Sequence, residues 1–323
     1  MSPFIDIIIP TYNRIEFLLK TLESISNLES ADLCEVYVFI NGSSDGTKDV
    51  LNKKYNWVNI INSNQNLSIS SSWNKSKLIG SNKYYMLLHD DDMLKENYLI
   101  ELKNFIYANK NCALIHSGAI LIDELDHQIG ITKHVYDEVM NGEDYFKTHI
   151  HHGLQFICPS VVYNRDLIPK SLKYNINLGY TLDVEFFLKC TRYGKVGYID
   201  KPIFKYRIHN HSISSNFFKN YHLKIKDRIE HRHFLELEIN NRLGTEFNYL
   251  AVQYFRASLS VDMLMYRLGQ NKINFIQSFK LVSMILNQDA KIFFKKIFWK
   301  NLFKLFLPQF IINFHRLKKR KLK

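Results

Sequence analysis

The sequence predicts an α/β fold in which helices flank a mostly parallel β-sheet. Two observations support this class: short apolar runs alternate with stretches of helical periodicity in the first half of the chain, and polar clusters follow three of these runs. Such alternation is typical of parallel sheets covered by helices. The chain has 323 residues, of which 46% are hydrophobic, and this is enough for a sizeable core.

The first half of the chain holds four predicted strands and four predicted helices. The strands are short runs rich in β-branched, aromatic and other apolar residues, at 4–9, 34–40, 57–61 and 84–88. The helices are expected at 15–26, from Asp45 to about 54, at 69–80 and at 96–109. In the first helix the apolar residues recur on one face: Ile15, Leu18, Leu19, Leu22 and Ile25. Asp45 is expected to cap the second helix.

The later elements are less regular. Residues 112–123 predict either a strand pair or one long bent strand, and residues 182–193 predict a helix. Two short strands are expected at 196–199 and 203–207. From about residue 216 glycine and proline become rare and long helical stretches follow. We therefore expect three parts: an α/β domain over 1–215, a helical extension over 216–290 and a basic amphipathic tail over 291–323.

Charge and cysteine usage limit the class of protein. The formal net charge is +12, which favours an anionic partner. The four cysteines are widely spaced without a C-x-x-C pair, so buried reduced thiols are expected rather than a zinc site. The first residues, MSPFIDIIIP, lack the pattern of a signal peptide, and no run of 18 apolar residues occurs. Together these features predict a cytoplasmic protein.

Polar clusters follow three predicted strands, at 10–14, 41–46 and 89–92. Each cluster taken alone is also typical of a helix cap or a turn. Because ligands of open α/β sheets bind beyond the carboxyl ends of the strands, the three clusters together predict a site at one edge. Asp90, Asp91 and Asp92 repel one another, and a divalent cation with oxygen ligands would offset this repulsion. The alternative is a solvated acidic turn.

The motifs in this order resemble those of family 2 glycosyltransferases with the GT-A, or Rossmann-like, fold. They read PTYNR (10–14), INGSSDGT (40–47), NQNLSISSSWNKS (64–76) and HDDD (89–92). The segment LGYTLDVEFFLKCTRYGKVGYIDKPIFKYRIHNHSIS (178–214) resembles the region of that family that carries the catalytic base. The resemblance covers about residues 3–215.

The resemblance implies a role for each matching residue. It places the nucleotide-sugar donor against Pro10, Thr11, Tyr12, Asn13, Arg14, Asn41, Ser68, Asn74, Asp90 and Asp91. It makes Asp92 the main ligand of Mn²⁺ or Mg²⁺, with Asp91, His209 and His211 as further candidates. Asp183 matches the general base, and its alternative role is that of an acid favoured by the helix dipole.

The chain also departs from the family pattern. Ile40 and Asn41 replace a common acidic pair, Ser68 replaces a usual glycine, and His89 replaces the first acid of the D-x-D motif. Asp92 and Asp183 remain, and a single base implies inversion at the anomeric carbon. A catalytically inactive relative that acts as a membrane-bound assembly partner is the alternative.

The C-terminal tail is strongly basic. Residues 291–323 hold eleven lysines and arginines and no acidic residue, and aromatic residues lie between them. This pattern favours an interfacial helix on an anionic membrane, which would bring the site to a lipid-linked glycan acceptor of bacterial surface polysaccharide synthesis, such as an O-antigen or capsule unit. A helix packed on the domain and a nucleic-acid patch are the alternatives, and the enzyme motifs argue against nucleic acid as the partner. The oligomeric state stays open.

Overall fold

The computed structural model describes residues 2–132, 137–152, 156–209, 212 and 221–251. The chain forms two compact units, Met1–His209 and Asn210–Lys323. The sheet and all the predicted site residues except His211 belong to the first unit. His211 and the tail at 291–323 lie outside the described residues.

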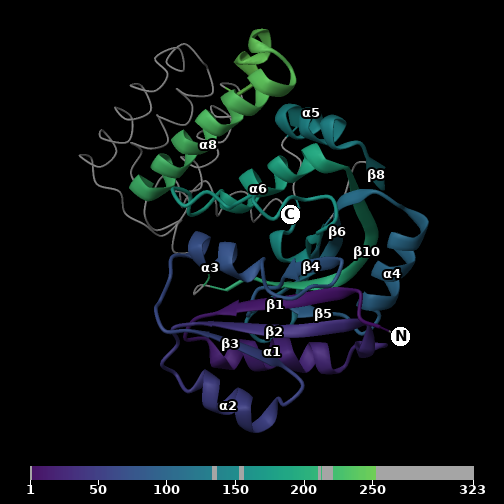
Figure 1. Ribbon diagram of the computed structural model, residues 1–323, viewed down its shortest axis with the longest axis vertical. Helices are drawn as coiled ribbons and strands as arrows, with labels where there is room; N and C mark the ends of the chain where they lie inside the picture. Colours follow the sequence, from purple (N-terminus) through teal and green to yellow (C-terminus); the bar gives the residue numbers. More distant parts are fainter. Residues whose placement is uncertain (1, 133–136, 153–155, 210–211, 213–220, 252–323) are drawn as a thin grey trace, which may run out of the picture. The chain divides into compact units, whose positions relative to one another are not determined.

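Within the described residues the first unit contains one sheet of ten strands (Figure 1). The main path has the order β3-β2-β1-β4-β9-β6-β10-β5, while β7 pairs with β6 and β8 with β10. The strands are β1 Ile5–Thr11, β2 Cys34–Asn41, β3 Asn59–Ser63, β4 Tyr84–Leu87, β5 Met93–Leu94, β6 Cys112–Ile122, β7 Gln128–Ile131, β8 Val139–Met140, β9 Val162–Asn164 and β10 Lys195–Arg207.

The longest pairings in the sheet are parallel. Strands β3, β2, β1 and β4 are parallel neighbours, and so are β6 and β10. Short β9 runs antiparallel between β4 and β6 and joins the two parallel groups. The predicted α/β class with a mostly parallel sheet is therefore confirmed.

Helices cover both faces of the sheet. They are α1 Ile15–Ser26, α2 Thr47–Lys54, α3 Ile69–Ser76, α4 Tyr98–Ala108, α5 Gly142–His152 and α6 Leu182–Cys190. Alternate residues of β1 face opposite sides, so Ile7 packs in the core with α1, whereas Ile8 packs with Trp73 of α3. Figure 1 shows α1 and α2 on one side of β1–β3 and α3 on the other. This arrangement leaves the carboxyl ends of the central strands open to other loops.

Several predicted boundaries are wrong in instructive ways. The third strand lies at 59–63 instead of 57–61, and the helix expected at 182–193 ends as α6 at Cys190. The two strands expected at 196–199 and 203–207 form one strand, β10, because register shifts near Pro202 absorb the interruption while pairing with β6 continues. Residues 112–122 form one long strand.

Asp45 does not occupy the N-cap position that the sequence suggested. Gly46 is the N-cap of α2 and has a φ of 81°, a left-handed conformation that glycine adopts easily. The Asp45 carboxylate still serves two helix starts, because it accepts hydrogen bonds from the backbone N–H groups of Thr47 (3.2 Å) and Ile15 (3.1 Å). Asp45 therefore joins the start of α1 to the start of α2.

The second unit is described over 221–251. It contains helix α8, Tyr221–Arg242, and a short 3₁₀ turn, Thr245–Phe247. Among the described helices, none combines the length and apolarity that a membrane crossing requires.

Candidate active site

The ends of β1, β2 and β4 come together, as their polar clusters predicted. The Thr11 hydroxyl donates a hydrogen bond of 2.7 Å to Asp90, which connects the end of β1 with the segment after β4. Asn13 connects β1 with β2, because its backbone N–H donates to the Ser43 hydroxyl and its side-chain oxygen accepts from the Ser44 N–H. Asn13 has a φ of 51°, a conformation that asparagine tolerates better than most residues.

Arg14 and His209 hold two of the three carboxylates. The Arg14 Nη1 atom lies 3.1 Å from Asp90 Oδ1 and 2.8 Å from Asp91 Oδ2. The Nε2 atom of His209 lies 2.9 Å from the same Asp91 Oδ2. Arg14 and His209, both predicted site residues, therefore contact the acidic cluster directly.

Asp92 is the most deeply buried acid of the cluster. Its exposed fraction is 0%, and its Oδ1 accepts a hydrogen bond of 2.8 Å from the backbone N–H of Arg207. Its second oxygen, Oδ2, is buried and has no hydrogen-bond partner among the described residues. The Nδ1 atom of His89 lies 3.7 Å from that oxygen. Such an orphaned carboxylate oxygen costs free energy unless a cation or proton satisfies it.

The three carboxyl groups have different proton affinities. Burial, with the charge of Asp91, raises the pKa of Asp90 to about 6 against the opposing effect of Arg14. Burial also raises the pKa of Asp91, but the hydrogen bond to His209 and the charges of His89 and Arg14 outweigh it, so that pKa is lowered. Burial and the charge of Asp91 raise the pKa of Asp92 well above its ordinary value. The innermost carboxyl therefore binds a proton more tightly than a carboxyl in water does.

The donor atoms of this cluster fit a divalent cation. One ligand atom each from His89, Asp91 and Asp92 lies within 4.8 Å of the others. Two carboxylates and an imidazole are ordinary ligands for manganese and related ions. The orphaned Asp92 oxygen gives a physical reason for binding, because a cation would pair the buried carboxylate charge.

Asp183 lies in the first turn of α6 and near the same cluster. The thiol of Cys158 hydrogen-bonds to Asp183, and the charges of Asp183 and Asp92 both act on that thiol. Tyr206 likewise has its pKa raised, first by burial and then by the charges of Asp92, Asp91 and Asp183. The charges of the predicted base and of the predicted metal ligand, which are separated by 91 residues (92 to 183), therefore both act on Cys158 and Tyr206.

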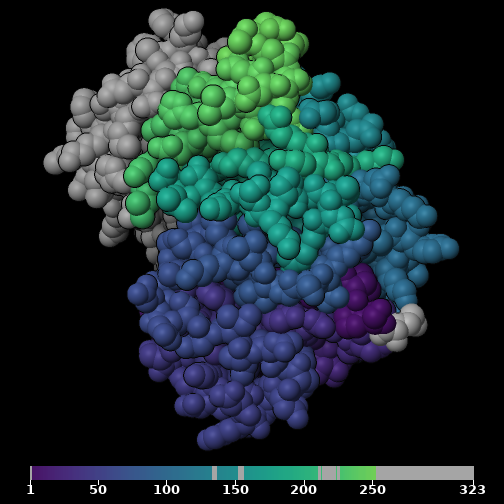
Figure 2. Space-filling view, in the orientation of Figure 1, coloured from purple at the N-terminus to yellow at the C-terminus, as the bar shows by residue number. Residues whose placement is uncertain are grey.

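Three predicted donor-binding residues make hydrogen bonds that stabilise neighbouring segments of this structure. The side-chain amide of Asn41 bonds to Asn66, to the carbonyl of Leu67 and to the N–H of Leu67. Ser68 is the N-cap of α3. The side-chain amide of Asn74 donates to the carbonyl of Tyr174 (2.9 Å) and accepts from the backbone N–H of Tyr174 (2.8 Å). In Figure 2 the blue surface, to which α3 contributes, borders the teal surface, which is formed by residues later in the sequence.

Two further residues fix the cluster, and the sequence analysis missed them. Arg207 donates through its backbone N–H to Asp92 and through Nε to the carbonyl of Asp91. The hydroxyl of Thr21 in α1 lies 2.9 Å from the carbonyl oxygen of Asp90 and 2.8 Å from that of Asp92, so its single hydrogen is shared between the two. Strand β10 also contains Lys195, Lys201 and Lys205, so the sequence did not single out Arg207. Thr21 likewise carried no signal.

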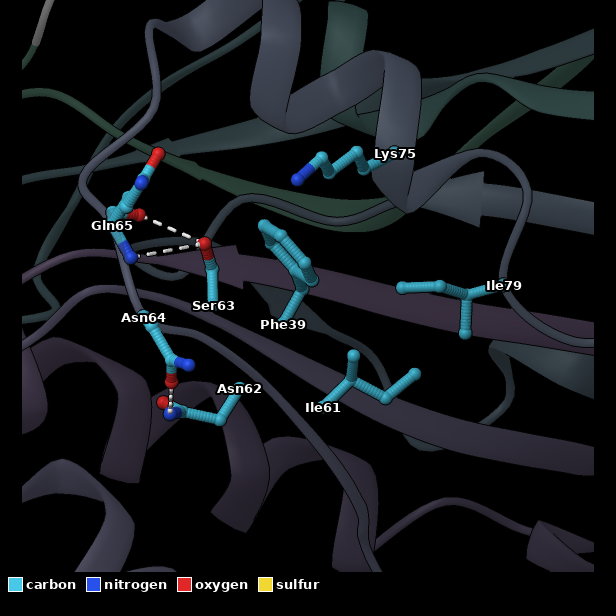
Figure 3. Close-up of a pocket in the computed structure, with 8 residues that line it drawn as sticks. All are labelled: Phe39, Ile61, Asn62, Ser63, Asn64, Gln65, Lys75 and Ile79. Atoms are coloured by element: carbon cyan, nitrogen blue, oxygen red, sulfur yellow. Dashed lines mark hydrogen bonds between the residues drawn. The ribbon is translucent and has the colours of Figure 1, made fainter.

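A separate open pocket of about 550 Å³ lies at the edge of the sheet (Figure 3). Figure 3 shows Lys75 of α3 reaching over Phe39 of β2, with Ile61 and Ile79 beside the ring and Gln65 opposite. None of the predicted site residues lines this pocket, so it is distinct from the carboxylate cluster.

Known proteins with this architecture define its class. Residues 6–166 match the family model described as "Glycosyl transferase family 2". The chain is 25% identical over 217 residues to an uncharacterized glycosyltransferase of Methanocaldococcus jannaschii, which covers 65% of this chain and 72% of the relative. It is 34% identical over 123 residues to the abequosyltransferase RfbV of Salmonella typhimurium, which covers 36% of this chain and 37% of the relative.

Solved structures agree on the fold. Staphylococcus aureus TarS in complex with UDP-GlcNAc superposes with a TM-score of 0.68 at 15% identity, covering 90% of this chain and 83% of that one. The mannosyltransferase PcManGT of Pyrobaculum calidifontis, in complex with GDP-Man and Mn²⁺, has a TM-score of 0.52 at 12% identity and covers 94% and 86%. The fold is therefore the GT-A fold of glycosyltransferases. The chain belongs to glycosyltransferase family 2.

Proposed function

We propose that this glycosyltransferase moves a sugar from a nucleotide-sugar to a hydroxyl of a glycan acceptor, with inversion and with the help of a divalent cation. The observation that carries the proposal is that the charges of Asp183 and of the buried, half-satisfied Asp92 both act on Cys158 and Tyr206. A base and a cation site side by side are what the transfer requires.

The donor end of the reaction is assigned to the rim formed by the ends of β1, β2 and β4. Thr11, Tyr12 and Asn41 would face the base of the nucleotide, and Asp91 would face its ribose and diphosphate. Tyr12 is 43% exposed, which leaves its ring available for such a contact. The bound UDP-GlcNAc of TarS and GDP-Man of PcManGT support a nucleoside diphosphate sugar as donor.

A cation fits among His89, Asp91 and Asp92, and the Mn²⁺ of PcManGT supports this choice. When bound, it would supply Lewis-acid stabilisation of the charge that develops on the diphosphate leaving group. Arg14 and His209 orient Asp91 by holding its Oδ2. Arg207 fixes the side chain of Asp92 by donating to its Oδ1.

Asp183 is proposed as the general base that accepts the proton of the attacking hydroxyl. An acceptor hydroxyl has a high pKa, so a carboxylate must take its proton in the transition state. The hydrogen bond from the Cys158 thiol orients the Asp183 carboxylate before the acceptor arrives. With one base and direct attack, the configuration at the anomeric carbon inverts.

The acceptor is proposed to be a lipid-linked glycan, built in the synthesis of a bacterial surface polysaccharide. The support is the basic tail at 291–323, whose eleven cationic side chains suit an anionic membrane. The similarity to an abequosyltransferase, which acts in sugar transfer, is consistent with this class of substrate.

The test is a thermal-shift screen of the full chain against UDP-, GDP-, TDP- and CMP-sugars, with and without Mn²⁺. A donor present at about 100 times its dissociation constant should stabilise the fold by about 2.7 kcal/mol. We expect one nucleotide to stabilise the protein in a Mn²⁺-dependent way, and we expect Asp92→Asn to lose the Mn²⁺ dependence. Folded protein that responds to no donor would instead favour an inactive relative that serves as an assembly partner.

A further inference from the structure

We propose that His89 is a nitrogen ligand of the cation site, and that this ligand gives the site a preference for Mn²⁺ over Mg²⁺. The inference deepens the proposed function and rests on its cation dependence. It assigns a role to the residue that departs most clearly from the acidic pattern of the motif at 89–92.

The geometry places the imidazole at the cluster. A ligand atom of His89 lies within 4.8 Å of ligand atoms of both Asp91 and Asp92. The Nδ1 atom is 3.7 Å from the orphaned Asp92 Oδ2, a separation too long for a hydrogen bond but suited to two atoms that share a cation. The second ring nitrogen, Nε2, is buried and has no hydrogen-bond partner among the described residues.

The surroundings of His89 hold its ring in place. The indole of Trp73 lies against it, with ring centroids 5.5 Å apart and planes tilted by 36°. The carbonyl of His89 accepts a hydrogen bond of 3.3 Å from the backbone N–H of Asp92, which closes a tight turn between the two residues. Ring and carboxylate therefore approach each other in a fixed arrangement, as a preorganised site requires.

The other described histidine at the cluster is placed differently. His209 directs Nε2 to Asp91 Oδ2, at 2.9 Å, and its side chain is 0% exposed. This is the arrangement of a residue that hydrogen-bonds to a metal-binding carboxylate without binding the metal itself. We therefore assign direct ligation to His89 and a supporting role to His209.

The chemistry of an imidazole ligand decides the metal preference. Mg²⁺ is hard, keeps oxygen ligands and dehydrates reluctantly. Mn²⁺ also takes carboxylate ligands but, as a first-row transition ion, accepts an imidazole nitrogen more readily than Mg²⁺ does. A cluster of two carboxylates and one imidazole thus favours Mn²⁺, while the all-carboxylate version of the same site would accept Mg²⁺ more readily. The His89→Asp variant creates that version within this chain.

The test uses Mn²⁺ itself as the probe, on the full chain, first alone and then with UDP or GDP. Pulsed electron paramagnetic resonance detects nitrogen nuclei bound to Mn²⁺, and labelling the histidines with ¹⁵N identifies the residue type. We expect a histidine nitrogen coupling in the wild-type protein that disappears in His89→Gln. Titration should show Mn²⁺ affinity weakened by at least about tenfold in His89→Gln.

Two comparison variants keep the result interpretable. The His209→Gln, His211→Gln double variant should keep the coupling, and it tests the assignment even if His89→Gln does not fold. In His89→Asp the ratio of Mn²⁺ to Mg²⁺ affinity should fall by about tenfold or more. Lys75→Ala, in the separate pocket of Figure 3, should leave both metal affinities unchanged.

The outcomes separate this inference from the proposed function. Mn²⁺ that binds without histidine coupling, or with coupling that survives in His89→Gln, overturns the role of His89 and leaves the cation site intact. Failure of Mn²⁺ to bind the wild-type protein in every condition overturns the cation dependence as well.

Discussion

Asp90, Asp91 and Asp92 are consecutive residues whose carboxyl groups have three different surroundings. Asp90 accepts from Thr11 and Arg14, Asp91 is held by Arg14 and His209, and Asp92 has one oxygen without a described partner. Their order along the chain therefore says little about their roles. The partners, which come from the end of β1, the start of α1 and the residues at and just after the end of β10, give the three carboxyl groups different environments.

The raised pKa of Asp90 predicts how stability depends on pH. Its pKa is 3.8 in an ordinary environment and about 6 in the fold, so between these values the folded protein keeps a proton that the unfolded chain releases. Ionisation of Asp90 in the fold is therefore costly, and the contribution of Asp90 to the free energy of unfolding of the metal-free protein should fall as pH rises from about 4 to 6.

Urea unfolding across this pH range checks the prediction. The Asp90→Asn variant carries no titrating group at this position, so its free energy of unfolding should fall less than that of the wild-type protein between pH 4 and 6. Parallel pH curves for the two proteins would show that Asp90 titrates normally in the fold.

Replacement of Asp183 by asparagine tests the proposed base. The variant keeps the size of the side chain but accepts no proton, so we expect kcat to fall by about 10²- to 10⁴-fold while donor affinity in the thermal-shift screen stays unchanged.

The matched control for this variant is Asp49→Asn. Asp49 lies in the first turn of α2 as Asp183 lies in the first turn of α6, but it is exposed and far from the cluster in the chain. Equal kcat losses in the two variants would mean that Asp183 acts through its helix dipole and not as a base.

At the scale of elements, the central strands depend on a buried ion pair. Asp6 of β1 is fully buried and faces Arg165, whose Nη2 lies 3.0 Å from Asp6 Oδ2. Arg165 also donates to the carbonyls of Lys77, Ile79 and Asn82, and its guanidinium stacks over Tyr85 at 4.4 Å. One side chain thereby joins β1, the turn before β4 and the end of β9.

Breaking this pair should be far more costly than breaking an exposed one. Arg165→Met removes the counter-ion of buried Asp6 and leaves it the hydrogen bonds from Asn82, so the free energy of unfolding should drop by about 3–5 kcal/mol. Lys83→Met removes the pair of Lys83 with Asp166, which are 54% and 61% exposed, and should cost no more than about 1 kcal/mol.

Urea unfolding of both variants measures the difference. The double variant Asp6→Asn, Arg165→Met should recover part of the loss, because it removes the uncompensated charge. Similar losses in Arg165→Met and Lys83→Met would contradict a special role for the buried pair.

The elements themselves were predictable where periodicity was strong. The spacing of Leu18, Leu22 and Ile25 located α1 correctly, and the polar clusters after β1, β2 and β4 located the rim. Antiparallel β9 was not predicted, because three residues carry too little pattern to show the direction of a strand. Likewise, local sequence did not reveal that Arg207 would reach Asp92, since their pairing depends on how distant strands are ordered.

At the scale of the whole molecule, charge is unevenly distributed along the chain. The tail at 291–323 carries eleven basic residues and no acid, against a net charge of +12 for the full chain. If this tail binds membranes, the full chain should sediment with vesicles containing about 30% anionic lipid and stay in solution with neutral vesicles, because each basic residue contributes about 1 kcal/mol near an anionic surface.

Salt and a charge-reduced variant test this prediction. Binding should weaken as salt is raised from 0.05 to about 0.5 M, since screening shortens the range of the attraction. Replacing Lys318, Lys319, Arg320 and Lys321 by glutamine should weaken it as well. Equal sedimentation with both kinds of vesicle would point to apolar contacts instead.

The pairing of β5 with β10 has a consequence for folding during synthesis on the ribosome. Strand β5 begins at Met93, directly after the acidic cluster, and pairs with β10 at Phe204 and Lys205. Translation adds residues in order. More than a hundred codons must therefore be translated after Asp92 before β10, the strand that pairs with β5, begins to be made. A stalled chain that ends before Lys195 would carry the whole acidic motif without the strand that shapes it.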